Sequence, residues 1–330
     1  MIMNLIVTGG AGFIGSNFVR HMLNTYPDYT IINLDLLTYA GNKESLADLI
    51  DNPKHVFVEG NITDRDLLDQ LITDYKVDGI INFAAESHVD RSILNPEVFV
   101  ETNIQGTLAL LDAARKHKLK KYVQVSTDEV YGSLGAEGYF TEDTPLAPNS
   151  PYSASKAGAD MLVRSYFETY GMDVNITRCS NNYGPYHFPE KLIPLMITNA
   201  MDQKNLPIYG DGENIRDWLH VTDHCAAIDL VFHKGKSGEV YNVGGHNERT
   251  NNQIVDLIVD RLDVSKDLVT YVEDRLGHDR RYAIDPIKLE TELGWKPKYT
   301  FDTGIVETID WYLANEAWWR PLKEKAELVK

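Results

Sequence analysis

Short apolar runs alternate with stretches of helical periodicity along the first two-thirds of the chain. The apolar runs have the length and composition of buried strands, and helical patterns such as residues 14–24 and 103–117 lie between most of them. The strands that this pattern predicts cover residues 4–8, 30–35, 56–61, 77–85, 121–127, 173–179 and 239–245. Strand and helix in alternation predict a parallel sheet with helices on both faces and right-handed crossovers.

The pattern becomes less regular after Tyr183, where prolines and turn residues interrupt it. A closing helix is predicted over residues 299–319, with Asp302 or Thr303 as its cap. We therefore expect the chain to leave the sheet near Tyr183, to build a smaller lobe, and to return to the sheet for residues 239–245.

Composition and charge narrow the class of protein. The chain has 330 residues, of which 43% are hydrophobic and 25% charged, as in a folded protein. Its net charge of −17 argues against nucleic acid and anionic membrane surfaces as partners, and an anionic substrate would need a local cluster of cations. The two cysteines, Cys179 and Cys225, form neither a metal motif nor a disulfide framework, so we expect no metal site and a reducing compartment.

The start of the chain does not have the pattern of a signal peptide, and no apolar run reaches the roughly 18 residues of a membrane span. We expect a cytoplasmic protein.

A glycine-rich turn, VTGGAGFIGS, follows the first predicted strand directly. Gly10, Gly12 and Gly15 satisfy G-x-G-x-x-G, and Gly9 starts the related G-x-x-G-x-x-G pattern. Such glycines let the backbone approach a pyrophosphate at the N-terminus of the next helix. Asp35 ends the second predicted strand, where an acid can accept from a ribose 2′-hydroxyl and would repel a 2′-phosphate. The motif in this context predicts NAD as the cofactor.

Together these features predict an α/β fold, a Rossmann-type doubly wound parallel sheet with a smaller, mostly C-terminal substrate-binding lobe. Residues 1–185 would form the NAD-binding domain, with a returning segment near residues 217–245. Residues 186–330 would form the lobe.

Tyr152 and Lys156 stand at the start of a predicted helix, in SPYSASKAGADML. Positions i and i+4 share a helix face, and an ammonium beside a tyrosine hydroxyl favours the phenolate, which makes Tyr152 a usable base. A second Tyr-x-x-x-Lys pair, Tyr39 and Lys43, lies in a glycine-containing loop and is not expected to have this role.

The predicted strand at residues 121–127 ends in Thr127, and Asp128 and Glu129 follow it. Ligands of open parallel sheets bind beyond the carboxyl ends of the strands, so these side chains should face the crevice where the nicotinamide would lie. Adjacent carboxylates in a crevice can differ in pKa, so that one acts as a base and the other as an acid. An ordinary solvated loop is the alternative interpretation.

The motifs GGAGFIG, DLLTYAGN, FAAESHVDRS, STDEVYG, YSASK and RLGHDRRYAID extend over nearly the whole chain. Together they resemble the extended short-chain dehydrogenase/reductases, and among these the nucleotide-sugar 4,6-dehydratases. The resemblance implies removal of water from dTDP-glucose to give dTDP-4-keto-6-deoxyglucose, a step in deoxysugar biosynthesis. The reaction would oxidise C4, eliminate water across C5–C6 and return the hydride to C6, with NAD recycled in each turnover. The resemblance also implies a homodimer whose small-molecule partner is a nucleotide sugar bound by residues 186–330.

The resemblance also implies individual roles at the site. Tyr152 would be the base at the C4 hydroxyl, Lys156 would hold the ribose and lower the pKa of the tyrosine, and Thr127 would hydrogen-bond the C4 oxygen. Glu129 would remove the C5 proton, and Asp128 would protonate the departing C6 hydroxyl. The reaction needs three proton-handling groups, and Tyr152, Glu129 and Asp128 are three.

Two larger sets of positions match the binding sites of the family. The cofactor positions are Gly9, Gly12, Phe13, Ile14, Gly15, Asp35, Leu36, Leu37, Thr38, Asn61, Ile62, Phe83, Ala84, Ala85, Thr102, Tyr152, Lys156 and Asn182. The substrate positions are Ser87, Thr127, Asn181, Lys191, Leu192, Pro207, Tyr209, Arg216, Asn251, Arg275 and His278. Arg216 and Arg275 are suited to a pyrophosphate as bidentate donors, and a surface ion pair is the alternative for either.

The chain departs from the family at Leu36, Asn61 and Leu276, where Lys, Asp and Pro are usual, and these changes bear on affinity rather than on the reaction. Three other functions compete with this interpretation. A nucleotide-sugar 4-epimerase also needs Tyr, Lys and NAD but has no task for Asp128 and Glu129. A dehydratase for another nucleotide-glucose would share the mechanism. A non-catalytic NAD-binding regulator would not need the intact catalytic set.

Overall fold

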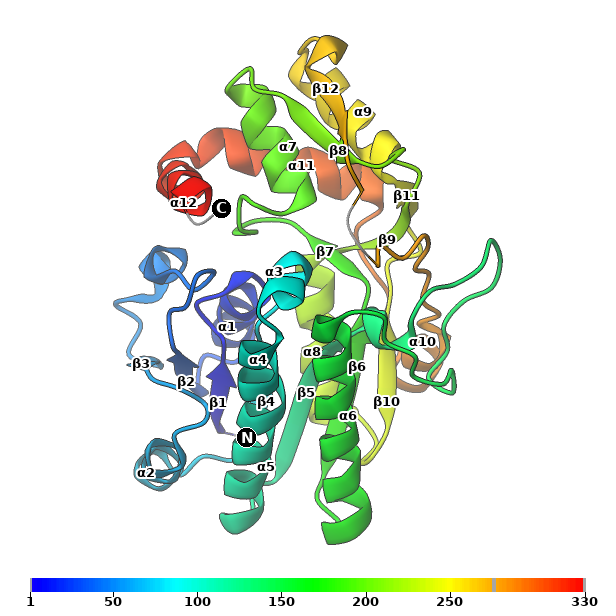
Figure 1. Ribbon diagram of the computed structural model, residues 1–330. Coiled ribbons are helices and arrows are strands. Elements are labelled where there is room, and N and C mark those ends of the chain that lie inside the picture. The colour runs from blue at the N-terminus through cyan, green and yellow to red at the C-terminus, as the bar shows by residue number, and fades with distance from the viewer. Residues whose placement is uncertain (1, 275–276, 329–330) are drawn as a thin grey trace.

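The larger part of the molecule is a parallel sheet (Figure 1). The computed structural model describes residues 2–274 and 277–328. Within these residues seven parallel strands lie in the order β10-β6-β5-β4-β1-β2-β3. Their bounds are β1 (Asn4–Thr8), β2 (Thr30–Asp35), β3 (His55–Glu59), β4 (Gly79–Asn82), β5 (Lys121–Thr127), β6 (Val174–Cys179) and β10 (Val240–Val243). The strand order reverses between β1 and β4, which places a ligand crevice at their carboxyl ends and confirms the predicted Rossmann-type sheet.

Helices cover both faces of this sheet. Because side chains alternate along a strand, Leu5 and Val7 of β1 pack in one core, together with α1 (Phe13–Thr25) and α8 (Val221–Lys234). Ile6 points to the opposite core, which contains α2 (Arg65–Tyr75), α5 (Gly106–Lys116) and α6 (Pro151–Tyr170). Figure 1 shows α6 in front of the sheet and α8 behind it.

A smaller lobe lies beyond the carboxyl ends of the strands, at the top of Figure 1. Its elements are α7 (Leu192–Met201), β8 (Leu206–Tyr209), α9 (Asn251–Leu262), β12 (Val269–Val272), α11 (Phe301–Ala314) and α12 (Glu316–Leu328). A small sheet of β7 (Asn181–Tyr183), β9 (Ile215–His220) and β11 (Glu248–Thr250) lies where the lobe meets the large sheet. The short elements are η1 (Lys43–Leu49), α3 (Val89–Leu94), α4 (Pro96–Phe99), the π-helix η2 (Val100–Gln105), η3 (Asp128–Tyr131), η4 (Lys266–Leu268) and α10 (Ile287–Leu293).

The predicted return of the chain involves three elements. β10 pairs with β6 and α8 covers the large sheet, whereas β9 belongs to the small sheet. The domain boundary at residues 185–186 stays a prediction. Among the described residues, no helix combines the length and apolar character that crossing a bilayer requires.

Some predicted element bounds were wrong. The run at residues 77–85 is a strand only over Gly79–Asn82, because the backbone of Phe83 and Ala84 turns to bond Thr8 at the crevice. The predicted closing helix over residues 299–319 is two helices, since Asn315 leaves the helical conformation (φ −121°, ψ 38°) between α11 and α12. The N-cap of α11 is Thr300, whose side chain accepts from the Thr303 N–H.

Candidate active site

The end of β5 carries the first part of the site. Thr127 is the N-cap of η3, and its hydroxyl accepts the Glu129 N–H at 3.2 Å. This turn places both carboxylates directly past the strand. The Asp128 side chain is buried, with 2% exposure, while Glu129 is half-buried. The pair is therefore not an ordinary solvated loop.

The surroundings of Asp128 favour its neutral form. Burial raises the pKa of this carboxyl well above its ordinary value, and the Glu129 and Asp217 carboxylates act in the same direction. Arg216 and the Thr127 hydroxyl, which donates to Oδ1 at 3.4 Å, oppose the shift. The buried Oδ2 has no hydrogen-bond partner among the described residues. A protonated carboxyl with a free oxygen can donate to a ligand.

The second part of the site is the start of α6. The helix begins with a capping box between Ser150 and Ser153, which holds its first turn at the crevice. Tyr152 and Lys156 are both buried on one face, as predicted from their spacing. The Lys156 ammonium donates to the Val125 carbonyl of β5 at 2.8 Å, which fixes the helix to the strand that carries the two acids.

Burial raises the pKa of Tyr152 well above its ordinary value, and the Glu129 carboxylate and the Cys179 thiol add to this shift. A hydrogen bond with Thr127 acts in the opposite direction. Burial also lowers the pKa of Lys156. The predicted lowering of the tyrosine pKa by Lys156 stays a prediction, and it has to overcome this burial.

The glycine-rich turn forms a cradle that side chains would fill. Gly9 has φ +69°, and a Cβ there would approach the Ala84 nitrogen to 2.7 Å. A Cβ on Gly15 would lie 2.2 Å from the Gly9 carbonyl oxygen. The following helix, α1, begins at Phe13 after Gly12, without a side-chain cap and without an acid in its first turn. Its free N–H groups fit the pyrophosphate of a dinucleotide.

Asp35 fits the ribose and also holds the cradle in place. Its carboxylate accepts the Ala11 N–H at 2.9 Å and the Leu37 N–H at 2.8 Å. Burial raises the pKa of Asp35, and these two bonds oppose that shift. A ribose hydroxyl could bond the remaining lone pairs, since each carboxylate oxygen accepts more than one hydrogen bond.

Other predicted cofactor positions surround this cradle. Ile62 is buried after β3, and Thr102 lies in η2. Asn61 accepts the Thr63 N–H at 3.0 Å, so its amide is partly used within its own turn. Leu36 is 47% exposed. Asn182 Oδ1 accepts a hydrogen bond from the His224 ring Nδ1 at 2.9 Å.

A cavity of about 400 Å³ reaches from the end of β2 toward the catalytic helix. It is lined by Thr38, Tyr39, Glu86, Arg91, Leu94, Asn95, Val98 and Phe99. The Phe99 ring meets the Tyr152 ring edge-on at 6.4 Å. The cavity lining thus includes the predicted cofactor position Thr38, and Phe99 of the same lining also contacts the Tyr152 ring.

The predicted substrate positions come from both parts of the molecule. Lys191, before α7, donates to the Ser87 carbonyl at 3.4 Å, which joins the lobe to the end of β4. Tyr209 of β8 meets the His278 ring edge-on at 6.5 Å. Asn181, Leu192, Pro207 and Asn251 lie in β7, α7, β8 and α9. Arg275 and Leu276 fall outside the described residues.

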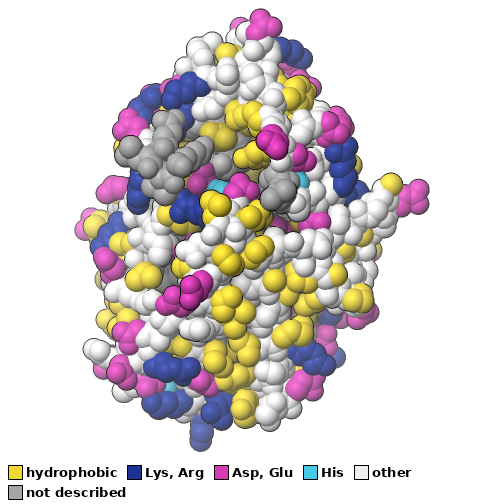
Figure 2. All heavy atoms as spheres, viewed as in Figure 1, with side chains coloured by type: hydrophobic (Ala, Val, Ile, Leu, Met, Phe, Trp, Pro, Cys, Tyr) yellow, Lys and Arg dark blue, Asp and Glu magenta, His cyan; other side chains and the backbone are white. Residues whose placement is uncertain are grey.

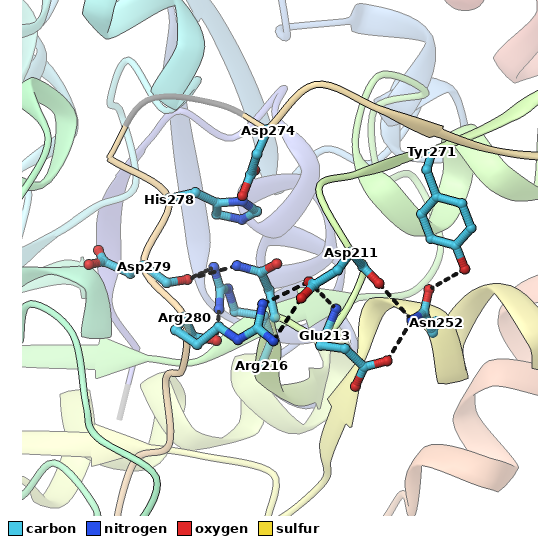
Figure 3. Close-up of polar contacts among 10 residues, drawn as sticks. Asp211, Glu213, Arg216, Asn252, Tyr271, Asp274, His278, Asp279 and Arg280 are labelled. Carbon is cyan, nitrogen blue, oxygen red and sulfur yellow. Dashed lines mark hydrogen bonds and ion pairs between the residues drawn. The ribbon is translucent and has the colours of Figure 1, made fainter.

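Figure 3 shows Arg216 of β9 beside Asp279 and Arg280. The Arg216 guanidinium donates to the Asp279 carbonyl at 2.8 Å and stacks on the Tyr282 ring at 4.3 Å. His278 pairs with Asp274 at 2.6 Å beside it. These contacts hold the buried Arg216 guanidinium in place, and its positive charge lowers the pKa of Asp128.

Three residues of the site were missed from the sequence. Asp217 and Cys179 are buried and act on the pKa values of Asp128 and Tyr152, and Tyr282 lies close enough to Glu129 for the carboxylate to raise its pKa. Tyr282 lies in the RLGHDRRYAID motif, and Asp217 follows Arg216 directly, so both had a signal in the sequence. Cys179 had none, because only the register of β5 and β6 places it opposite Thr127.

A dinucleotide cradle, a tyrosine and lysine on one helix, and a lobe over the same crevice define an extended short-chain dehydrogenase/reductase. A family model described as GDP-mannose 4,6 dehydratase matches residues 6–308. The chain belongs to the dTDP-glucose 4,6-dehydratase family. The dTDP-glucose 4,6-dehydratase of Xanthomonas campestris pv. campestris (strain B100) is 54% identical, over 95% of this chain and 94% of that protein.

Solved structures agree with this assignment. A crystal structure of dTDP-glucose 4,6-dehydratase from Bacillus anthracis str. Ames in complex with NAD is 57% identical, with a TM-score of 0.92 over 97% of this chain and 99% of that one. The dTDP-glucose 4,6-dehydratase of Streptomyces venezuelae, crystallised with NAD, is 52% identical, with a TM-score of 0.94 over 97% of this chain and 100% of that one.

Proposed function

We propose that the protein removes water from dTDP-glucose to give dTDP-4-keto-6-deoxyglucose, with NAD as a recycled cofactor. The observation that carries this proposal is the burial of Asp128 beside Glu129 at the end of β5, next to Tyr152, which raises the pKa of Asp128 and favours its neutral form. An acid and a base on one turn suit the loss of water across C5–C6. The names of the close relatives support the same reaction.

The first step takes place at C4. NAD, when bound, accepts the hydride from C4 and returns it to C6. Tyr152 removes the proton of the C4 hydroxyl, and Thr127 donates a hydrogen bond to the C4 oxygen as a ketone forms. Lys156, held on β5 by the Val125 carbonyl, supplies a positive charge that favours the tyrosine phenolate and offsets its burial.

The second step takes place at C5 and C6. The C4 ketone acidifies the C5 proton, which Glu129 removes. Asp128 protonates the C6 hydroxyl, so that it leaves as water. The same Glu129 then returns a proton to C5 when C6 is reduced. This division of labour requires one ionised and one neutral carboxyl, and burial of Asp128 supplies the neutral one.

Substrate binding would rely on local cations, because the net charge of the chain is −17. Arg216 would supply a fixed cation for the pyrophosphate, with Lys191 and Arg275 as further candidates. Tyr209, His278 and the other predicted positions of the lobe would contact the nucleoside. NAD would bind on the Gly9–Gly15 cradle, with Asp35 at the adenine ribose.

Incubation with dTDP-glucose tests this function, because a 4-keto-6-deoxy sugar absorbs in the ultraviolet in alkali. We expect this absorbance with dTDP-glucose and much less with UDP-, GDP- or CDP-linked glucose. A higher rate with another nucleotide-linked glucose would mean that the enzyme prefers a nucleotide base other than thymine. Interconversion of C4 epimers without loss of water would instead identify an epimerase, and no reaction with any of them would contradict the proposal.

We also propose a cytoplasmic homodimer. Hydrophobic side chains gather over the face formed by α4, α5 and α6 (Figure 2). Three exposed hydrophobic residues are Leu94 at the end of α3, Val100 at the start of η2 and Met161 on α6, with exposures of 85%, 44% and 47%. A second copy could cover this surface with its own α5 and α6. The two cysteines, Cys179 and Cys225, are free and buried, which suits a reducing compartment.

A further inference from the structure

A buried ion pair lies behind the catalytic groups. The Arg178 Nε donates to Asp160 Oδ2 at 2.9 Å, and the two side chains are 5% and 0% exposed. Arg178 also donates to the Tyr131 hydroxyl at 3.0 Å, and that hydroxyl donates to Asn242 Oδ1 at 2.7 Å. A buried ion pair rarely stabilises a fold more than apolar side chains of the same volume would, because both charges lose their hydration. Its presence in this place therefore calls for another reason.

The network joins the two elements that carry the chemistry. Asp160 follows Tyr152 and Lys156 at intervals of four residues, so all three share one face of α6. Tyr131 is the last residue of η3, the turn that begins with Asp128. Arg178 stands between them on β6, in register with Ser126 of β5. A shift of α6 relative to η3 would break at least one of these bonds.

Asp160 also acts on Lys156 through its charge. Burial lowers the pKa of its ammonium, whereas Asp160 on the same helix and Cys179 on β6 raise it. From η3, Asp128 and Glu129 face the neighbouring Tyr152. Asp160 is the carboxylate that acts on Lys156, so its removal would leave a buried ammonium with less support.

We propose that Asp160, Arg178 and Tyr131 form a positioning network, which keeps Lys156 protonated and holds the Tyr152–Lys156 pair at a fixed place relative to the two acids of η3. All three side chains are buried, and the network acts through Lys156 and η3. The inference rests on the proposed function for its kinetic tests, and a chemical test on Lys156 is independent of it.

The first test is the variant Asp160→Asn. The alkaline limb of kcat/KM, which reports loss of the Lys156 proton, should move to lower pH by roughly one unit. Competitive labelling of Lys156 with acetic anhydride at several pH values, read by mass spectrometry, should show the same shift without any substrate. Asp160→Glu keeps the charge and should restore much of the parent profile. Asp223→Asn, which removes an equally buried carboxylate on α8, should leave both readouts unchanged.

A second variant separates an effect on folding from an effect on the protonation of Lys156. If Asp160→Asn fails to fold because Arg178 is left unpaired, the double variant Asp160→Asn/Arg178→Gln removes both charges and should still show the shift in Lys156 labelling. An Asp160→Asn enzyme with the parent's alkaline limb and labelling profile would overturn the proposal. A parent enzyme that does not dehydrate dTDP-glucose would overturn the proposed function only.

The second test is Tyr131→Phe, which removes the link between Arg178 and Asn242 but keeps the ring. Exchange of the substrate's C5 hydrogen with solvent should fall by roughly tenfold, and oxidation at C4 should fall much less, because η3 carries the C5 base. Tyr122→Phe is the matched control, since its buried hydroxyl bonds Gln124 on β5 and not η3. Equal rates of both steps in Tyr131→Phe and the parent would remove Tyr131 from the network.

Discussion

Asp128 and Glu129 are neighbours in sequence and differ in their surroundings. The first is buried, and its burial with the Glu129 and Asp217 carboxylates raises its pKa, while the second is half-buried and near Tyr282. Under the proposed function, this difference decides which carboxyl gives a proton and which takes one. The acid and the base need not be distinguished by residue type, because burial and the neighbouring carboxylates raise the pKa of Asp128.

Replacement of Glu129 by Gln should separate oxidation from elimination. The amide keeps the size of the side chain but cannot act as a base, so elimination should fall by roughly 10²–10⁴-fold. Oxidation at C4 uses Tyr152, Lys156 and Thr127 and should survive. Reduced nicotinamide should then accumulate after mixing with substrate, as near-ultraviolet absorbance, while exchange of the C5 hydrogen with deuterium falls.

The companion variant Asp128→Asn should slow loss of the C6 hydroxyl and leave exchange at C5 in place. A Glu129→Gln enzyme that exchanges the C5 hydrogen at the parent's rate would exclude Glu129 as the base.

Asp35 has two tasks that substitutions can separate. Asp35→Ala removes the ribose acceptor, the repelling charge and the tether of Ala11, so affinity for NAD should fall by roughly 10–100-fold and its advantage over NADP should narrow. Asp35→Asn removes the charge and one of the two accepted backbone hydrogen bonds, because the amide nitrogen cannot accept, but it keeps one acceptor oxygen. Titration of NAD and NADP by calorimetry measures both effects. An unchanged preference for NAD in Asp35→Ala would mean that another residue reads the ribose.

At the scale of elements, α1 and α8 are joined by a polar cluster behind the sheet. Asp229 pairs with His21 and His233, both at 2.8 Å, and accepts the Tyr26 hydroxyl at 2.9 Å. Burial alone would raise the pKa of Asp229, but the bonds from His21, His233 and Tyr26 lower it to about 2. The pKa of His233 is raised: burial lowers it, and the bonds to Asp229 outweigh that effect.

This cluster should make stability depend on pH. The carboxylate stabilises the fold above its ordinary pKa of 3.8, and roughly 2 kcal/mol should be lost as the pH falls toward 2. The imidazolium of His233 stabilises the fold fully below its ordinary pKa of 6.5, and this stabilisation is lost as the pH rises through its raised pKa. Urea unfolding between pH 2 and 9 should therefore show an acid limb that Asp229→Asn flattens. Asp223→Asn should keep that limb, since burial raises the pKa of Asp223.

Much of the fold could be predicted from local pattern. β1, β2 and β5 match the predicted runs at both ends, because a buried parallel strand is a continuous apolar run with turn residues after it. The break at Asn315 could not be predicted, since both sides of it have helical periodicity. The catalytic spacing of α6 was readable, whereas Asp160 and Arg178 meet only through packing of α6 on β6. Contacts between distant segments have no signal in one sequence.

At the scale of the whole molecule, the proposed dimer can be measured directly. Light scattering at micromolar concentration should give twice the mass of one chain. Met161→Glu places a charge on the exposed face of α6 and should shift the mass toward the monomer, because a buried unpaired charge is unfavourable. Ile50→Glu, at an exposed position outside α4, α5 and α6, is the control. A monomeric parent chain would contradict the dimer.

Among the described residues, the lobe has a hydrophobic core formed by residues such as Trp218, Phe301 and Trp319, and its buried side chains differ from those of the two cores of the large sheet. The predicted ligand positions include Asp35 and Tyr152 on the side of the large sheet, and Tyr209 of β8 and Arg216 of β9 on the other side. A ligand that contacts both sides adds contacts that only the folded protein offers. Substrate and cofactor should then raise the free energy of unfolding as well as take part in the chemistry, and the protein should be most stable with both bound.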